Sequence, residues 1–229
     1  MEKSLPFEMR KEIIGCDLDD VVRDTITKIL EFSNPLFGLN LKKEDIWTYD
    51  SWRLWGCTEE RSNEIIVKFY DSPYFKDIEA CEGAVEGLRA LAPYYSPHII
   101  TACSTKVQDI SRRHLDTYCP EMVLPLHHAC SHYFPINGPD PQRTKGEICH
   151  ALGIEIMIED NPTFAYACAQ RGITTYLMKA PWNKDTPEHP LIIPVNGWDE
   201  LTERLYKRWT QPLKTVVNVC RDGITLQRA

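Results

Sequence analysis

The sequence predicts an α/β fold in which a parallel sheet is covered by helices on both faces. Short apolar runs alternate with amphipathic stretches along most of the chain, which is the order expected of parallel strands joined by helices. At 229 residues the chain also suits one sizeable domain, or one domain with a smaller insert. The expected strands are Glu12–Cys16, Pro97–Thr101, Met122–Leu126, Ile154–Ile158 and Thr174–Leu177.

Helical patterns lie between these apolar runs, because apolar residues recur there at the spacing of one helix face. One helix is expected to begin at Pro162 and to end near Gly172, since proline favours the first turn of a helix and glycine follows the last. The other predicted faces are formed by Val22, Ile26, Ile29 and Leu30, by Val85, Leu88, Leu91 and Ala92, by Val107, Ile110, Leu115 and Tyr118, and by Trp198, Leu201, Leu205 and Trp209.

The alternation is interrupted between residues 34 and 80, a stretch longer than a simple crossover between parallel strands requires. Within Thr58–Tyr70, apolar residues repeat at helical spacing. We therefore expect a small helical cap domain at 34–80, inserted into a Rossmann-like core made of 1–33 and 81–229. Its aromatic residues could stack on a flat ligand or simply build the core of a small module; they are Phe37, Trp47, Tyr49, Trp52, Trp55, Phe69, Tyr70, Tyr74 and Phe75.

Composition and charge argue against one class of partner and leave another open. Hydrophobic residues make up 43% and charged residues 26% of the chain, as in soluble globular proteins. The net charge of −7 argues against binding to a nucleic-acid duplex, which needs a basic surface. A small phosphorylated ligand remains compatible with this charge, because a metal ion and a few basic residues can make a local positive pocket.

The cysteines and the hydropathy pattern predict a cytoplasmic protein. The nine cysteines are odd in number and scattered, and no Cys-x-x-Cys pair occurs, so we expect reduced thiols. The first fifteen residues lack the uninterrupted apolar core of a signal peptide, and no apolar run approaches the length of a membrane span. We therefore expect no membrane partner, while the sequence leaves open whether the chain forms a homodimer.

The clearest chemical signal lies at the end of the first predicted strand, where Asp17 and Asp19 follow a short apolar run. Residues two apart on a strand point the same way, so both carboxylates can enter one pocket. Two carboxylates that close repel unless a cation lies between them, and Mg²⁺ prefers such oxygen ligands. The alternative interpretation is an ordinary turn after a strand, since aspartate is common in turns.

Three further signals lie at strand ends or at a helix start. Thr101 places a hydroxyl at the end of the second strand, and Lys145 lies at the start of a helix. Glu159 and Asp160 follow the buried run that ends at Ile158. In parallel sheets, ligands bind outside the carboxyl ends of the strands. Each signal taken singly also fits a structural or surface residue.

Taken in order, these motifs resemble the haloacid dehalogenase superfamily of phosphotransferases, and the resemblance runs from about Ile13 to Asn183. Within that superfamily the chain most resembles the 5′(3′)-deoxyribonucleotidases. Besides the helical insert, this narrower resemblance rests on Tyr70–Phe75, Glu82–Val85 and Ala180–Asn183.

The resemblance implies a role for each motif. Asp17 would attack phosphorus and form an aspartyl-phosphate, while Asp19 would protonate the leaving oxygen and then activate water. The Asp17 carboxylate, the Asp19 carbonyl and Asp160 would hold Mg²⁺. Phosphoryl oxygens would be bound by Thr101 and by the backbone N–H of Ala102. Lys145 would neutralise developing charge, and Glu159 would orient Lys145 or a metal-bound water.

Some positions depart from the family pattern. Asp20 stands where glycine is usual, Thr25 where an aromatic residue stacks on the base, and Ala102 where a hydroxyl residue is usual. Arg23 follows the first motif closely, so we expect it to bind substrate phosphate or the cap, or else to form a surface salt bridge.

The stretch from His127 to Gln142 is predicted to form a long loop near the site entrance. It contains a dense cluster of metal-ligand types whose spacing fits no zinc template, and a structural metal is a minor alternative there. The cluster consists of His127, His128, Cys130 and His132.

The sequence thus predicts a Mg²⁺-dependent phosphomonoesterase acting on a nucleoside monophosphate, with a deoxynucleotide as the expected substrate. One alternative is a phosphatase of another small ester such as a sugar phosphate. A second alternative is a non-catalytic phosphoryl-binding protein on the same fold.

Overall fold

The computed structural model describes residues 11–130 and 143–210, together with the backbone of two strands at 215–220 and 223–228. Its centre is a six-stranded sheet in the order β3-β2-β1-β4-β5-β6, and every neighbouring pair is parallel. This arrangement confirms the predicted α/β fold. The strands are β1 (Glu12–Cys16), β2 (Tyr95–Thr101), β3 (Leu126–His128), β4 (Ile156–Glu159), β5 (Thr174–Met178) and β6 (Ile192–Val195).

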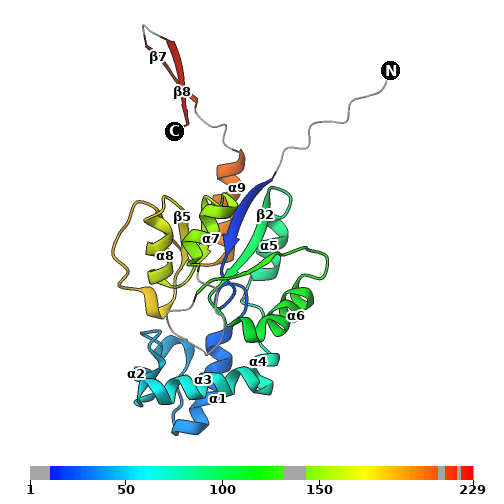
Figure 1. Ribbon diagram of the computed structural model, residues 1–229, viewed down its shortest axis with the longest axis vertical. Helices are drawn as coiled ribbons and strands as arrows, with labels where there is room; N and C mark the ends of the chain where they lie inside the picture. Colours follow the sequence, from blue (N-terminus) through cyan, green and yellow to red (C-terminus); the bar gives the residue numbers. More distant parts are fainter. Residues whose placement is uncertain (1–10, 131–142, 211–214, 221–222, 229) are drawn as a thin grey trace.

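Helices cover both faces of this sheet (Figure 1). On one face Ile14 and Ile158 pack in a cluster with α5 (Ala84–Leu91) and α9 (Trp198–Thr210). On the other face Met157 packs with α7 (Lys145–Leu152) and α8 (Pro162–Ala169). Successive residues of a strand therefore pack into apolar cores on opposite faces of the sheet. This explains why the strands are continuous apolar runs in the sequence.

The bounds of β2, β4 and β5 differ from the prediction by at most two residues at either end, and two other strands of the sheet differ more. β3 begins four residues later than expected, because Val123 is 91% exposed and the pairing with β2 starts only at Leu126. His127 and His128 consequently belong to the sheet and not to a loop, which corrects the start of the predicted 127–142 loop. β6 was not predicted; it is a short edge strand containing Pro194, which an edge position tolerates.

Between β1 and α5 the chain forms helices and no named strand. These are α1 (Thr25–Phe37), the 3₁₀ turn η1 (Lys43–Asp45), α2 (Ser51–Trp55), α3 (Glu59–Asp71) and α4 (Pro73–Lys76). They lie together at the lower end of the molecule in Figure 1, beyond the carboxyl ends of the strands. Helix α1 crosses the expected boundary at residue 34, and the division into core and cap stays a prediction.

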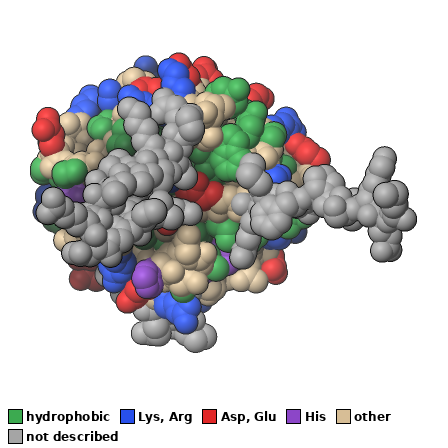
Figure 2. Space-filling view, turned by 90° about the horizontal axis from the view of Figure 1, so that it is seen from above, with side chains coloured by type: hydrophobic (Ala, Val, Ile, Leu, Met, Phe, Trp, Pro, Cys, Tyr) green, Lys and Arg blue, Asp and Glu red, His purple; other side chains and the backbone are tan. Residues whose placement is uncertain are grey.

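The remaining short elements are η2 (Thr105–Val107), α6 (Gln108–Tyr118) and η3 (Pro181–Asn183). After α9, the strands β7 (Thr215–Cys220) and β8 (Gly223–Arg228) pair antiparallel, a hairpin that the sequence analysis did not foresee. Within the described residues, no helix combines the length and the apolar character needed to cross a membrane. At the end of the molecule opposite the cap helices, basic and acidic side chains are interspersed (Figure 2).

Candidate active site

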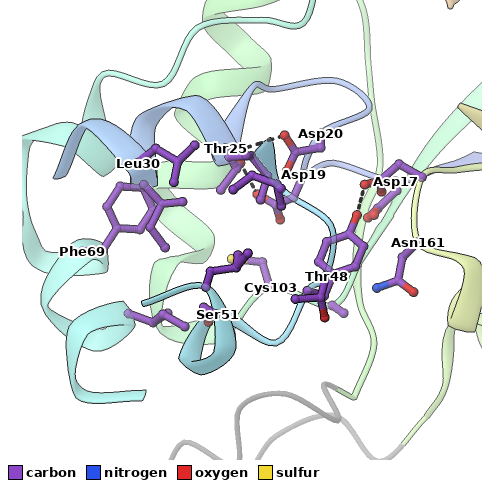
Figure 3. Close-up of a pocket in the computed structure, with 18 of the residues that line it drawn as sticks. Asp17, Asp19, Asp20, Thr25, Leu30, Thr48, Ser51, Phe69, Cys103 and Asn161 are labelled. Carbon is purple, nitrogen blue, oxygen red and sulfur yellow. Dashed lines mark hydrogen bonds between the residues drawn. The ribbon is translucent and has the colours of Figure 1, made fainter. Parts of the chain in front are cut away.

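A cavity opens where the carboxyl ends of β1, β2 and β4 meet the helices of the 34–80 segment. Asp17, Asp19, Ala102, Lys145 and Asp160 line its sheet side. Its other side is mostly apolar, with hydroxyls from Thr25, Thr48 and Ser51. Figure 3 shows Asp17, Asp19 and Asp20 on the segment that follows β1, and Thr48 and Ser51 on the inserted 34–80 segment.

Lys145 lies between two buried carboxylates. Its Nζ is 2.8 Å from Asp17 Oδ1 and 2.8 Å from Glu159 Oε2, and its side chain is 1% exposed. Burial disfavours the ammonium ion, but Asp17 and Glu159 outweigh it and raise the lysine pKa. For Asp17, burial and the nearby Glu159 raise the pKa well above its usual range, and Lys145 opposes them.

Glu159 is held on both oxygens. Its Oε2 accepts from Lys145, and its Oε1 accepts from the backbone N–H groups of Asp160 and Asn161. Asn161 also caps α8, since its side chain accepts from the backbone N–H of Thr163. These bonds fix the chain at the end of β4, and with it the direction of the Asp160 side chain.

Asp160 is buried and is held by groups from distant parts of the sequence. Its Oδ2 accepts from Trp182 Nε1 at 3.0 Å and from the hydroxyl of Tyr49. Its carbonyl accepts from Asn183 Nδ2 at 2.8 Å. Burial, followed by Asp20 and Asp17, raises its pKa well above the usual range. Sequence reasoning gave neither Tyr49 nor Trp182 a role at Asp160, because both contacts depend on how the cap and η3 fold back over β4.

The donor set fits a divalent cation. Carboxylate oxygens of Asp17, Glu159 and Asp160 lie within 4.8 Å of one another. Around the cavity, six carboxylates lie with three basic side chains, Lys43, Lys145 and Arg23, which leaves an excess of negative charge that is costly to bury. Hard oxygen ligands in this number suit Mg²⁺. The Asp19 carboxylate is not part of the cluster, and the sequence prediction assigned only its carbonyl to the metal.

Asp20 adopts the left-handed backbone conformation, with φ of 59°. This conformation favours glycine, the residue usual in the resembling family, and aspartate tolerates it better than most side chains. Burial raises the pKa of Asp20 to about 7, although Lys43 Nζ lies 3.1 Å away and opposes that effect. Asp20 therefore adds a buried negative charge at a backbone position that glycine would adopt without strain.

Arg23 contacts the cap, which was one of its expected partners, because its guanidinium lies 4.8 Å from the centroid of the Phe75 ring. Arg23 is fully buried, so a surface salt bridge is wrong, while its predicted contact with substrate phosphate stays a prediction. Its Nε donates to Asp19 Oδ1 at 2.8 Å. Thr25 Oγ1 donates to the same oxygen, which accounts for a hydroxyl at position 25 in place of an aromatic ring.

The second motif lies beside the carboxylates. Thr101 is fully buried, its Oγ1 accepts from the backbone N–H of Cys103 at 2.9 Å, and it lies 3.5 Å from Asp19 Oδ2. Ala102 lines the cavity. Their predicted contact with phosphoryl oxygens stays a prediction.

The histidine cluster does not form a metal site among the described residues. His127 stacks on His98 with an interplanar angle of 7°, and His128 Nδ1 contacts the Cys103 carbonyl. In the described part of the chain, the group able to hold a metal is the acidic one at the cavity. His132 lies outside the described residues.

A parallel sheet carrying an aspartate pair, a buried lysine and a second acidic pair at its carboxyl edge defines a phosphatase of the haloacid dehalogenase superfamily. The family model of the 5′ nucleotidase, deoxy (Pyrimidine), cytosolic type C protein matches residues 11–129. The chain belongs to this family.

Solved structures support the fold independently. A predicted phosphatase from Clostridium acetobutylicum superimposes with a TM-score of 0.59 at 17% identity, over 86% of this chain and 99% of that chain. A haloacid dehalogenase-like hydrolase from Streptococcus pneumoniae gives 0.58 at 13% identity, over 85% and 98%. A hydrolase of the same superfamily from Deinococcus radiodurans, solved with bound phosphate and sodium, gives 0.55 at 18% identity, over 86% and 96%. No curated protein matches the sequence.

Proposed function

We propose that the protein is a Mg²⁺-dependent phosphomonoester hydrolase that releases phosphate from nucleoside monophosphates, as a 5′(3′)-deoxyribonucleotidase. The observation that carries this proposal is the convergence of Asp17, Asp19, Lys145 and Asp160 on one cavity. Membership of a nucleotidase family supports the substrate class. It also favours an enzyme over a non-catalytic phosphoryl-binding protein.

Asp17 is the proposed nucleophile, and its hydrogen bonds select the attacking atom. Lys145 Nζ and the backbone N–H of Leu18 both bind Oδ1, each at 2.8 Å. Oδ2 is therefore the oxygen free to attack phosphorus. As the new bond from Oδ2 to phosphorus forms, the ester bond breaks, and Lys145 balances the charge on the phosphoryl group.

Asp19 is the proposed general acid and base. It donates a proton to the leaving oxygen in the first step and takes a proton from water in the second. Water then attacks phosphorus and releases Asp17 with inorganic phosphate. The Asp17 carboxylate, the Asp19 carbonyl and the Asp160 carboxylate would hold Mg²⁺, which supplies further charge neutralisation. Glu159 keeps Lys145 in place.

The lining of the cavity supports a substrate with one phosphate and an uncharged remainder. Lys145 is the basic residue among the described lining, and it already contacts two carboxylates. Beyond it the wall is formed by apolar and aromatic side chains, among them Trp55 and Phe69. Such walls suit a nucleoside better than a second phosphate group.

A sugar phosphate is the second candidate substrate. The hydroxyls of Thr25, Thr48 and Ser51 favour it, because they could bind sugar hydroxyls.

Phosphate release from a panel of nucleoside monophosphates and sugar phosphates, with Mg²⁺ and with a chelator, tests the proposal. We expect deoxynucleoside monophosphates to give the highest kcat/KM and the chelator to remove turnover. An Asp17→Asn variant with an unchanged circular dichroism spectrum should be inactive. Retained turnover in that folded variant would refute the nucleophile role, and preference for sugar phosphates would refute the substrate class.

A further inference from the structure

Arg23 is the largest fully buried side chain among the described residues, and its charge lies directly behind Asp19. We propose that Arg23 is a positioning residue that holds Asp19 so that its Oδ2 carries the transferred proton. This inference rests on the proposed function, because it assumes that Asp19 is the general acid.

The two oxygens of Asp19 have different surroundings. Oδ1 accepts from Arg23 Nε at 2.8 Å and from Thr25 Oγ1 at 2.5 Å. Oδ2 has one long contact, 3.5 Å from Thr101 Oγ1. The side chain is 29% exposed and lines the cavity. Two strong donors on Oδ1 make protonation there unfavourable, so Oδ2 is the oxygen available to carry a proton to the leaving group.

Arg23 is itself held rigidly. Its Nη1 lies 3.2 Å from Ser111 Oγ and 3.2 Å from His114 Nδ1, both on α6. Its guanidinium also lies over the Phe75 ring of α4, 4.8 Å from the centroid. The segment after β1, the end of the inserted helices and α6 therefore fix one guanidinium from three sides.

The hydrogen bonds of His114 indicate its tautomer. A guanidinium can only donate, so Nδ1 of His114 must accept from Arg23. Its Nε2 then donates to the Lys76 carbonyl, 3.1 Å away. Neutral His114 satisfies both contacts. Ser111 and His114 therefore hold the Nη1 atom of the Arg23 guanidinium, and this keeps its Nε directed at Asp19.

Proton donation depends on the position of the acid and matters most for poor leaving groups. A leaving group that is stable as an anion needs little protonation, whereas an alcohol or a phenol needs more. If Arg23 only neutralised a buried charge, its loss would lower the amount of folded enzyme and would slow all substrates equally. If Arg23 positions Asp19, its loss slows poor leaving groups more than good ones.

The test compares kcat/KM for phenyl phosphate and 4-nitrophenyl phosphate on the same preparation of each variant. The ratio of the two values is independent of the folded fraction, and kcat/KM reports on steps up to loss of the leaving group. We expect Arg23→Gln to lower the phenyl to nitrophenyl ratio about tenfold or more, since general acid catalysis contributes about 10²–10⁴ in rate. Thr25→Val, which removes the other donor to Oδ1, should lower the ratio in the same direction.

Two controls separate the outcomes. Arg113→Gln removes an exposed arginine from α6 and should leave the ratio unchanged. Asp19→Asn should lower the ratio at least as far as Arg23→Gln. If Asp19→Asn lowers it and Arg23→Gln does not, the positioning role of Arg23 is overturned. If Asp19→Asn leaves it unchanged, the acid role of Asp19 in the proposed function fails instead.

Discussion

At the scale of single residues, Lys145 has the strongest effect on the charge balance of the site. It pairs with Asp17 and Glu159 at 2.8 Å, and all three side chains are buried. The ammonium ion also lies 4.4 Å from the centroid of the Phe164 ring. Removing one partner of a buried ion pair leaves an uncompensated charge, which costs more than the intact pair contributes. Lys145 is therefore expected to support both stability and catalysis.

We expect Lys145→Met to lower the free energy of unfolding by about 3 kcal/mol and to reduce turnover below detection, because two buried carboxylates lose their partner. Urea denaturation and a phosphate-release assay measure the two effects. Lys106→Met removes an exposed lysine from η2 and should change stability by less than about 0.5 kcal/mol. A Lys145→Met protein as stable as the wild type would show that this charge balance is unimportant.

At the scale of elements, the contact between β2 and β3 contains a pair of histidines that disfavours protonation. His98 Nδ1 lies 3.1 Å from His127 Nε2, and the two rings are stacked. Burial, together with the neighbouring His127, lowers the pKa of His98. Burial and His128 lower the pKa of His127. One proton shared between the rings satisfies the contact, whereas a charge on both would break it.

This pair predicts a pH dependence of stability. A histidine whose pKa is lower in the folded state binds fewer protons there than in the unfolded state, so stability falls as pH drops below about 6.5. The urea midpoint of the wild type should therefore fall more between pH 7.5 and pH 5.5 than that of His98→Gln. His114, whose pKa is also lowered, is present in both proteins and does not affect the comparison. Equal losses in the two proteins would contradict this assignment.

Elements with their own local pattern were predictable from the sequence, and those fixed by pairing were not. Glu12–Cys16 carries a buried apolar run and coincides with β1. At β3, the apolar run 122–126 predicted the wrong residues, because pairing with Ile99 and Ile100 selects the polar His127 and leaves Val123 exposed. A short edge strand such as β6 has too little pattern of its own to predict.

The same distinction applies to the site. Asp17, Lys145 and Asp160 were predictable because strand ends and helix starts carry them to one edge of the sheet. The burial of Arg23 against α6 was not, because Ser111 and His114 are about ninety residues away in sequence. Nor was the bond between Tyr49 and Asp160, which depends on how the inserted helices lie over the sheet.

At the scale of the whole molecule, negative charge is concentrated where the substrate would bind. The chain carries a net charge of −7, and the carboxylates of Asp17, Glu159 and Asp160 meet at the cavity. Burial and repulsion from neighbouring carboxylates raise the pKa of both Asp17 and Asp160. A cation that binds the folded state and not the unfolded chain therefore stabilises the fold in proportion to its binding.

We expect Mg²⁺ to raise Tm, because saturation at about a hundredfold excess over Kd adds about 2.7 kcal/mol to the free energy of unfolding. Calorimetry with Mg²⁺ and with a chelator measures the shift. Asp160→Asn should abolish it without lowering Tm in the chelator, since it removes one of the repelling carboxylates. An equal shift in this variant, or no shift in the wild type, would contradict the predicted metal site.

The central claim is that Asp17 carries the phosphoryl group during turnover, and trapping this intermediate tests it most directly. Enzyme mixed with a preferred substrate is quenched in acid within one turnover, reduced with borohydride, digested and analysed by mass spectrometry. An aspartyl-phosphate is reduced to homoserine, so the account predicts homoserine at position 17 and no other changed aspartate. Homoserine at a different position, or a first turnover of product with Asp17 unchanged, would contradict it.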